Sequence, residues 1–475
     1  MGQLGRSKDG RRLFCNDGVA LVELESRLPV LQDADLNGKI VLIRVDHNVV
    51  KGNKIKDAYR IDQSLATLYN VVEHGGRPII MTHVGRPFHK DSGRIAADES
   101  TSVAPIVSYL QNKLGISIGV PKFVADAERG IQSIDTTIMS MIRDLRARKL
   151  GAIYLPNTRW FEGEEGKFGE DARERLAAML AGIADVFVND AFGSWQPHVT
   201  TCDITRHLPS YAGLLMQKEI AHLSMISSPR RPFLAVIAGS KYDTKIGTLN
   251  VICEDVDALI LGGVLYNAYL CAKYGVRIRG VAEEEVEAAR ALLKYAPKIM
   301  ELPIIVESDS VRKVEGQWRR REVTDLKAGD ELGYVVDVGA GAFSSPAIAT
   351  AIAGAGTIFV NAVMGITENG FREGTRALDE AVGGNMAARK LFGGGDTLHE
   401  FKSIAPGLYL AALEDVSYYL FTGGGTVLTA IQKGSAYGLP TVQALMENAD
   451  RAGYQPRTVS CECDTLPGGC TSPRW

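Results

Sequence analysis

The chain has 475 residues, of which 45% are hydrophobic and 23% are charged, a composition typical of a globular protein with two or three domains. Its formal net charge of −3 excludes a broad electrostatic attraction to nucleic acid or to an anionic membrane. A phosphate-bearing ligand must therefore be bound by a local cluster of basic residues. The seven cysteines are an odd number and too few for a disulfide framework in a chain this long, which favours a reducing, cytoplasmic location.

Two segments bear on targeting. Residues 1–20 carry charges throughout and include no apolar stretch of the kind found in a secretory signal. Val338–Thr367 contains no charged residue, but it is rich in Gly, Ala and Ser and includes Pro346. This composition predicts a loop, a buried helix and a buried strand rather than a membrane span.

In chain order, short apolar runs rich in Val and Ile alternate with amphipathic segments. The predicted strands are Ile40–Val45, Pro78–Met81, Ala152–Leu155, Val186–Val188, Phe233–Ile237, Ala258–Leu261, Pro303–Val306 and Thr357–Val360. The predicted helices between them include Arg60–His74, Ala172–Ile183 and Glu284–Tyr295. This alternation is typical of βαβ units and predicts an α/β fold with mostly parallel sheets.

A domain boundary is predicted near the middle of the chain. Leu208–Gly213 contains Pro and Gly, a helical stretch follows at Leu214–Met225, and Ser227–Pro232 interrupts the pattern before a new strand. The sequence therefore predicts a first lobe over residues 1–213 and a second over residues 214–439, joined by a helix.

Polar and basic residues follow the predicted strands of the first lobe. They are Asp46 and Asn48, Arg60, His83 and Arg86, and Arg159. Ligands bind outside the carboxyl ends of parallel strands, and guanidinium groups bind phosphate and carboxylate in a bidentate manner. Each of these residues alone is typical of a solvated surface, but their shared position predicts an anion site.

The second lobe is instead rich in glycine after its predicted strands. The segments are Gly262-Gly263, Gly393–Thr397 and Gly423–Gly425. Glycine lets the backbone approach a phosphate closely, and a helix N-terminus supplies N–H donors. Asp396 is suited to Mg²⁺, and Lys241, after the strand at Phe233–Ile237, is suited to neutralising a phosphoryl group in transfer. Together these features favour a nucleotide site.

Eight ordered motifs give a specific resemblance. They are Arg-Val-Asp-x-Asn, His-x-Gly-Arg-Pro, Asn-x-Arg, Asn-Asp-Ala-Phe-Gly, Gly-x-Lys-x-x-x-Lys, Met-Gly-x-x-Glu, Gly-Gly-Gly-Asp-Thr and Thr-Gly-Gly-Gly. Over roughly Leu28 to Leu445, the chain resembles the phosphoglycerate kinase family. The resemblance implies two Rossmann-like lobes joined by a hinge helix, with residues 440–475 returning to the first lobe and ending in a loose tail.

The resemblance also implies an activity, reversible phosphoryl transfer between ATP and the carboxylate of 3-phosphoglycerate with Mg²⁺, by a cytoplasmic monomer. The implied acceptor-binding residues are Asp46, Asn48, Arg60, His83, Arg86 and Arg159, with Arg60 and Lys241 catalytic. The implied nucleotide-binding residues are Lys241, Lys245, Gly262, Gly263, Asn361, Glu368, Gly394, Gly395, Asp396 and Thr397. Asp396 is the implied metal ligand, and the only implied partners are the small-molecule substrates.

The chain departs from the family pattern in both lobes. An arginine of the acceptor site is replaced by Pro197, with His198 beside it, and the nucleotide loop has Val363 where the family has proline. His47 and Pro156 replace the usual Phe and Glu. Three interpretations follow: a phosphoglycerate kinase with a modified acceptor pocket, a related kinase for another small acid, or a non-catalytic binding protein. Retention of Arg60, Lys241 and Asp396 favours an enzyme. Cys461, Cys463 and Cys470 lie in the tail, where free thiols are expected rather than a metal site.

Overall fold

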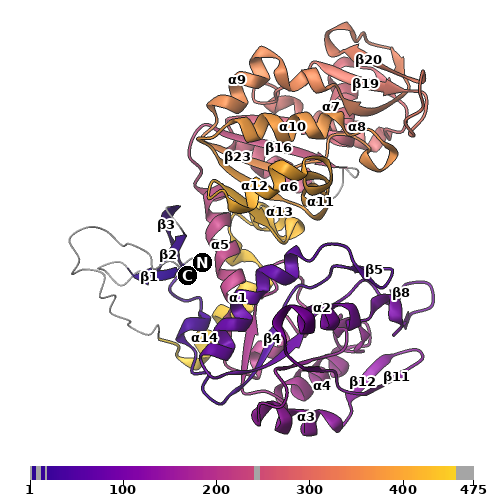
Figure 1. The fold of residues 1–475 in the computed structure, drawn as a ribbon. Coiled ribbons are helices and arrows are strands. Elements are labelled where there is room, and N and C mark those ends of the chain that lie inside the picture. The colour runs from indigo at the N-terminus through magenta and orange to yellow at the C-terminus, as the bar shows by residue number, and fades with distance from the viewer. Residues whose placement is uncertain (1–2, 7–11, 17–18, 240–245, 456–475) are drawn as a thin grey trace, which may run out of the picture. The chain divides into compact units, whose positions relative to one another are not determined.

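The structure is a computed structural model that describes residues 3–6, 12–16, 19–239 and 246–455 (Figure 1). The chain divides into two compact units. Unit 1 comprises the residues before His222 together with the chain from Leu439 onward, and unit 2 comprises His222–Gly438. Each unit is built around its own parallel sheet.

Unit 1 contains a six-stranded sheet in the order β10-β13-β7-β4-β14-β15, with every pairing parallel. The strands are β4 (Ile40–Arg44), β7 (Arg77–Met81), β10 (Ile118–Gly119), β13 (Ala152–Tyr154), β14 (Val186–Asn189) and β15 (Ser210–Ala212). The chain adds β7 and β13 on one side of β4 and then β14 and β15 on the other. In such a sheet the ligand crevice lies where the strand order reverses, here at the carboxyl ends of β4 and β14.

Helices cover both faces of this sheet (Figure 1). Successive side chains of a strand point to opposite faces, and Val41 and Ile43 of β4 pack in one apolar cluster while Ile40 and Leu42 pack in another. The first cluster includes residues of α1 (Tyr59–Glu73) and α2 (Ala104–Leu114), and the second includes residues of α3 (Thr137–Arg146) and α4 (Glu170–Ala181). Burial on both faces explains why the strands read as continuous apolar runs.

Unit 2 contains a five-stranded parallel sheet in the order β17-β16-β23-β24-β25. Its strands are β16 (Phe233–Gly239), β17 (Ala258–Gly262), β23 (Thr357–Asn361), β24 (Arg389–Gly393) and β25 (Tyr418–Phe421). Its helices include α6 (Ile246–Asp255), α7 (Gly263–Tyr274), α9 (Pro346–Gly354), α10 (Glu373–Gly384), α11 (Gly395–Ile404), α12 (Pro406–Glu414) and α13 (Gly424–Gln432). The strand order reverses between β16 and β23, which places the expected crevice at their carboxyl ends.

Smaller sheets complete the described chain. In unit 2, β19 (Ile304–Ser308) pairs antiparallel with β20 (Trp318–Glu322) and β22 (Tyr334–Val338), and β18 (Arg277–Ile278) pairs with β21 (Glu331–Leu332). The N-terminal part of unit 1 contains an antiparallel sheet of β1 (Gln3–Arg6), β2 (Arg12–Asn16) and β3 (Val19–Leu24). Three short ribbons pair β5 (Val50–Lys51) with β6 (Lys54–Ile55), β8 (Phe88–His89) with β9 (Arg94–Ile95), and β11 (Phe123–Asp126) with β12 (Gly130–Ile134).

Two helices are informative about the chain path. The division between the units falls within α5 (Leu214–Ser227), after Ala221. α14 (Pro440–Ala452) belongs to unit 1, where the Asn448 side chain accepts a hydrogen bond from the Ser210 amide at 3.1 Å and donates one to the Leu208 carbonyl at 3.1 Å. Unit 1 is therefore formed from two stretches of chain that lie far apart in the sequence.

The structure corrects two local predictions. The helix predicted over Glu284–Tyr295 is α8 (Glu283–Arg290) followed by a 3₁₀ turn at Leu293–Tyr295, because hydrogen bonds to the third preceding residue tighten the chain after Arg290. The buried helix predicted within Val338–Thr367 is α9, in which only Ile348 and Ile352 are buried. Its other residues are mostly Ala and Gly, which offer little apolar area to bury. Among the described residues, every helix is too short or too polar to span a bilayer.

Candidate active site

The switch point of unit 1 brings together Asp46, Asn48 and Arg60. Arg60 lies in the first turn of α1, and its guanidinium is 3.2 Å from Oδ2 of the buried Asp46 carboxylate. The other carboxylate oxygen, Oδ1, is also buried and has no hydrogen-bond partner among the described residues. Asn48 uses its side-chain oxygen to accept a 2.9 Å hydrogen bond from the Gly85 amide. The strand end thus presents a carboxylate acceptor beside a half-exposed arginine.

A second group, centred on Arg44, positions His83. Arg44 is fully buried at the end of β4, and its Nη2 lies 3.1 Å from Nδ1 of His83. Because guanidinium nitrogens only donate, Nδ1 accepts, and the remaining imidazole proton must lie on Nε2. Burial, followed by the positive charge of Arg44, holds the pKa of His83 well below its usual range. His83 is therefore a neutral imidazole with a fixed tautomer.

The positive charge of Arg44 is compensated by the buried carboxylate of Glu164, to which it is connected through the Thr200 hydroxyl. Its Nε donates to the Thr200 hydroxyl at 2.9 Å, and that hydroxyl donates to Oε1 of Glu164 at 2.6 Å. The Thr200 amide donates to Oε2 of the same carboxylate at 3.0 Å. Glu164 is fully buried, so this network supplies the counter-charge that a buried guanidinium requires.

Arg159 and Arg86 have different surroundings. Nη1 of Arg159 donates to the Gly85 carbonyl at 2.6 Å, and its Nε lies 2.8 Å from Oε1 of Glu165. Asn157 fixes the loop, because its side chain accepts from the Val84 amide at 3.0 Å and donates to the Val84 carbonyl at 2.7 Å. Arg86 is exposed. Residues 83–86 and 157–159 are thus adjacent, as expected for neighbouring parallel strands.

The unusual His47 has a structural environment. It is fully buried, with Nδ1 2.9 Å from the Tyr154 hydroxyl and Nε2 2.8 Å from the Ser64 hydroxyl. Ser64 donates to the Ile61 carbonyl at 2.8 Å, so it accepts from Nε2, and Tyr154 donates to Nδ1. Burial lowers the pKa of His47 to about 3, which keeps this side chain neutral.

In unit 2, glycines allow the backbone segments at the strand ends to approach one another. Gly263 begins α7 with φ +60°, and a Cβ there would lie 2.9 Å from the Gly239 carbonyl oxygen. A Cβ on Gly424, at the start of α13, would lie 2.2 Å from Cα of Gly394. Gly394 itself has φ +130°, a region that other residues rarely adopt. Larger residues cannot be placed at these positions without moving the backbone.

The remaining predicted residues of unit 2 follow the same strands. The Asn361 side chain donates to the Gly393 carbonyl, which joins the ends of β23 and β24. Gly262 ends β17, Thr397 is buried in the first turn of α11, and Asp396 and Glu368 are exposed. Lys241 and Lys245, and the tail cysteines Cys461, Cys463 and Cys470, lie outside the described residues.

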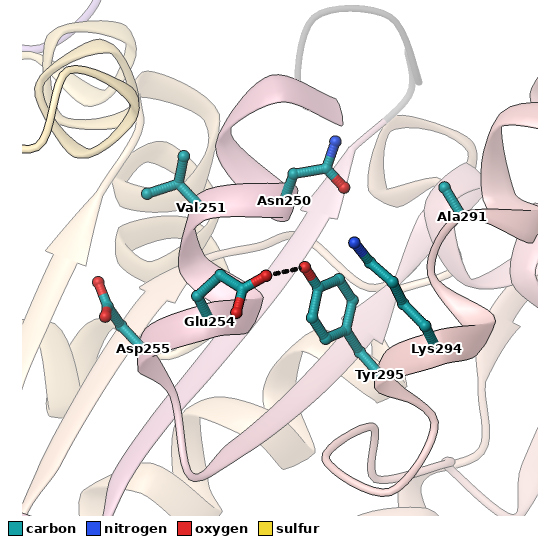
Figure 2. A pocket seen from close by; sticks show the side chains of 7 residues that line it. All are labelled: Asn250, Val251, Glu254, Asp255, Ala291, Lys294 and Tyr295. Atoms are coloured by element: carbon teal, nitrogen blue, oxygen red, sulfur yellow. Dashed lines mark hydrogen bonds between the residues drawn. The ribbon is translucent and has the colours of Figure 1, made fainter.

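A separate cavity of about 490 Å³ in unit 2 contains none of these residues. Figure 2 shows its lining, in which the Tyr295 hydroxyl donates to the Glu254 carboxylate. Glu254 and Asp255 end α6 shortly before β17 begins. This cavity therefore lies toward the amino end of β17, whereas the predicted nucleotide residues follow the carboxyl ends of the strands.

Sequence reasoning assigned no role to Arg44, Ser194, Thr200 or Glu164. The Ser194 hydroxyl lies 3.4 Å from Nδ1 of His83, and the other three form the buried network. Only Arg44 carries a visible signal, a charged residue at the end of an otherwise apolar strand. Thr200 and Glu164 lie in loops, and nothing in their local sequence indicates burial.

Solved structures define the class of protein. The phosphoglycerate kinase of Coxiella burnetii matches with a TM-score of 0.67 and 28% identity, over 89% of this chain and 100% of that one. That of Pyrococcus horikoshii matches with a TM-score of 0.70 at 20% identity over the same shares, which is a likeness of fold. The protein is thus a two-domain α/β protein with the fold of these kinases.

Sequence comparisons then establish the family. The family model described as phosphoglycerate kinase matches residues 31–433. The phosphoglycerate kinase of Thermomicrobium roseum is 33% identical over 427 residues, covering 88% of this chain and 99% of the relative. That of Roseiflexus castenholzii is 32% identical over 418 residues, covering 85% and 95%. The chain belongs to the phosphoglycerate kinase family, whose members are phosphotransferases that use ATP or ADP and act on a carboxyl group. The predictions of the family, the α/β fold and the enzyme class are confirmed.

Proposed function

We propose that this protein transfers a phosphoryl group reversibly between ATP and the carboxylate of 3-phosphoglycerate. The observation that carries the proposal is the buried Oδ1 of Asp46, which has no hydrogen-bond partner among the described residues. An unsatisfied buried acceptor costs about 1–3 kcal/mol. A ligand hydroxyl next to the reacting carboxylate, as in 3-phosphoglycerate, would supply the missing donor.

The neighbouring side chains suit the two anionic ends of such an acid. Arg60, ion-paired with Asp46 at 3.2 Å, is placed to hold the carboxylate and then the phosphoryl group in transfer. Asn48 orders the same loop through Gly85. His83, Arg86 and Arg159 suit the phosphate at the other end, and neutral His83 offers its Nε2 proton. In this assignment the chain positions and neutralises charge, which is most of what phosphoryl transfer requires.

The nucleotide is assigned to the strand ends of unit 2. Helices α7, α11 and α13 begin within a few residues of β17, β24 and β25, so their free N–H groups are available to phosphate oxygens. We assign the phosphates to Gly394, Gly395 and Thr397, and the base and ribose to Gly262, Gly263, Asn361 and Glu368. The roles of Lys241 and Lys245 at the phosphates rest on the family resemblance.

Asp396 is assigned as the ligand of Mg²⁺. Within the described residues, no group of three or more His, Cys, Asp or Glu side chains is placed to hold a metal ion. Mg²⁺ needs only one or two protein carboxylates when nucleotide phosphates supply the other oxygens. Asp396 is exposed in the first turn of α11, beside the proposed phosphate-binding backbone, so the residue fits this ion. When bound, Mg²⁺ neutralises charge on the phosphates.

Three further features complete the proposal. We propose that bending at α5 brings the two bound substrates together and excludes water during transfer. We also propose that the protein acts as a monomer in the cytoplasm. The scattered free thiols, Cys202, Cys253 and Cys271, are the observation behind the proposed location.

A second candidate acceptor is a different small acid. Pro197 stands where the family has an arginine, and its position is exposed, with its carbonyl accepting a 3.1 Å hydrogen bond from Arg173. A site with one fewer cation favours an acid with less negative charge. The same buried Oδ1 of Asp46 would then bind a hydroxyl on that acid.

The proposal is tested by ADP release from Mg-ATP, with and without 3-phosphoglycerate, in the wild type and in Asp46→Asn. We expect turnover that requires 3-phosphoglycerate and a loss of about 100-fold in kcat/KM for that acid in the variant, because a charged hydrogen bond is lost. KM for ATP should stay unchanged.

Asp126→Asn is the matched control, since Asp126 is an exposed residue at the end of β11 in unit 1, and it should keep full activity. Lys241→Ala tests whether the turnover belongs to this protein. ATP binding without turnover on 3-phosphoglycerate would favour the second acceptor. Absence of ATP binding would overturn the enzymatic proposal and leave a binding protein.

A further inference from the structure

His198 lies next to the proposed acceptor residues of unit 1. Its ring is 15% exposed, and Nε2 is 3.9 Å from Oε1 of Glu165. The same carboxylate oxygen is 2.8 Å from Nε of Arg159. Two nitrogen-bearing side chains therefore converge on one anionic oxygen.

The backbone around His198 is fixed by several hydrogen bonds. Its amide lies 2.8 Å from the Gln196 carbonyl and 3.1 Å from the Thr201 hydroxyl. Its carbonyl accepts from the amides of Thr201 at 3.2 Å and Cys202 at 2.9 Å. The backbone position of His198 is thus fixed by a tight turn, and this turn contains Thr200, which bridges Arg44 and Glu164.

Charges of both signs face the ring. They come from Glu164, Arg159, Glu165 and Arg44, and His83 lies in the same group. Burial is the largest influence on the imidazole of His198 and lowers its pKa. The negative charges of Glu164 and Glu165 raise this pKa, whereas the positive charges of Arg159 and Arg44 lower it further. An additional anion bound between Arg159 and His198 would favour the protonated imidazole.

Pro197, the residue that replaces the family arginine, cannot supply a cation. Its side chain has no donor, and its carbonyl is occupied by Arg173 at 3.1 Å. His198 is the neighbouring residue in the sequence, and its ring points to the group formed by Arg159 and Glu165. His198 is therefore the adjacent residue whose side chain can donate a hydrogen bond to an anion at this site.

We propose that His198 binds the phosphate group of the acceptor together with Arg159, in place of the missing arginine. This inference rests on the proposed function and adds a specificity-determining residue to it. Imidazolium donates a charge-assisted hydrogen bond to a phosphate oxygen, whereas neutral imidazole donates a weaker one. Loss of the imidazolium proton as pH rises therefore weakens binding of a phosphorylated acid. The phosphate itself gains its second negative charge at about pH 6, so the effect of His198 is the difference between its pH profile and that of a site in which arginine replaces it.

The test is the pH dependence of KM and kcat for 3-phosphoglycerate between pH 5.5 and 8.5, in the wild type, His198→Ala, His198→Gln and His198→Arg. We expect KM of the wild type to rise with pH relative to KM of His198→Arg, which carries the same pH dependence of the substrate phosphate. KM of the alanine variant should be about 10-fold to 100-fold higher than that of the wild type at low pH, and this ratio should shrink as pH rises. The arginine variant should have a low KM whose ratio to that of the alanine variant does not shrink as pH rises. At each pH, kcat should differ less than threefold among the variants, because the phosphate is remote from the reacting carboxylate.

His207→Ala is the matched control, because the His207 ring lies 3.4 Å from the exposed Glu174, in the same connection between β14 and β15. It should leave KM and its pH profile unchanged. Circular dichroism checks folding, and the glutamine variant replaces the ring with a neutral donor. If wild type and His198→Ala share one KM and one pH profile, the inference is overturned while the proposed function stands.

Calorimetric binding of 3-phosphoglycerate without nucleotide separates the two proposals. If the wild type does not turn this acid over but binds it, and His198→Ala weakens binding, the inference holds and the proposed reaction fails. Equal binding by both proteins, or none by either, overturns the inference.

Discussion

The regions at the carboxyl ends of the two parallel sheets contain different types of residue. In unit 1 four of the six candidate residues are charged side chains, and His83 is positioned by a network in which Arg44 and Glu164 are fully buried. In unit 2 four of the ten candidate residues are glycines at or next to helix starts, and the charged ones among the described residues, Asp396 and Glu368, are exposed. The difference teaches that a site built from cationic side chains, as in unit 1, needs buried counter-charges to keep its geometry. A site built from backbone N–H groups, as in unit 2, needs only that the backbone segments approach one another closely.

The largest expected effect breaks the charge network of unit 1. Glu164→Gln removes the counter-charge of buried Arg44, and we expect unit 1 to lose about 3–5 kcal/mol of unfolding free energy. Fluorescence of the buried Trp160 during urea unfolding measures this loss. The exposed pair of Arg94 and Glu128 is the control, and Glu128→Gln should cost less than about 0.5 kcal/mol. An equally small cost for Glu164→Gln would contradict the network.

The next effect tests close approach in unit 2. Gly424→Ala places a Cβ 2.2 Å from Cα of Gly394, and overpacking of this kind costs about 1–3 kcal/mol. Nucleotide affinity should fall as well, because the two helix starts are forced apart. Gly425→Ala is the adjacent control, since a Cβ there meets nothing within 4 Å. It should stabilise α13 by up to about 1 kcal/mol, and calorimetric unfolding with and without ADP distinguishes the two variants.

The smallest effect, counted per pH unit, is the change of unfolding free energy with pH. It sharpens the comparison of the two units, because their stabilities should change with pH in opposite directions. Burial lowers the pKa of His47 in unit 1 to about 3 and raises that of Asp379 in unit 2 to about 8. A histidine with a lowered folded pKa loses its stabilising contribution as pH falls from about 6.5 to about 3. An aspartate with a raised folded pKa loses it as pH rises from about 4 to about 8, by at most about 1.4 kcal/mol per pH unit.

Hydrogen exchange measured across this pH range resolves the two units. Protection of α10, which carries Asp379, should decline toward alkaline pH, and Asp379→Asn should flatten that decline. In unit 1, burial raises the pKa of the Asp190 carboxyl to about 7, so this group stabilises the unit as pH falls. It opposes the effect of His47, and the loss of stability at acid pH should therefore be partial. If protection of β4 and of α10 changed with pH in the same direction, the expected difference between the two units would be contradicted.

The parallel sheets were predictable because their strands are buried on both faces. Eight apolar runs mark strands of the structure, and the polar residues that follow β4, β7 and β13 are brought together by the parallel sheet itself. The apolar pattern of the sequence does not indicate whether a strand pairs parallel or antiparallel, and the pairings of β19 are antiparallel. Its buried Glu307 is held by Arg319 at 2.6 Å and Arg321 at 2.9 Å from the neighbouring strand, and such cross-strand contacts leave no local pattern.

The candidate site was predictable only where chemistry follows a strand directly. Asp46, His83 and Arg159 satisfy that condition. Thr200 and Glu164 do not, because they become neighbours of Arg44 only through loops that fold back over the sheet. His47 was visible as a departure from the family, but its neutral state depends on hydroxyls of Tyr154 and Ser64 from other elements. Long-range contacts of this type are fixed by tertiary packing rather than by local sequence.

The place of α14 has a consequence for synthesis on the ribosome. Unit 2 is one continuous stretch, so it can fold as soon as Gly438 has left the exit tunnel. Unit 1 emerges first, yet its β15 edge waits for Asn448 to reach Ser210 and Leu208. The unit that is translated earlier is therefore completed later, and a nascent chain stalled before Leu439 would expose that edge to chaperones.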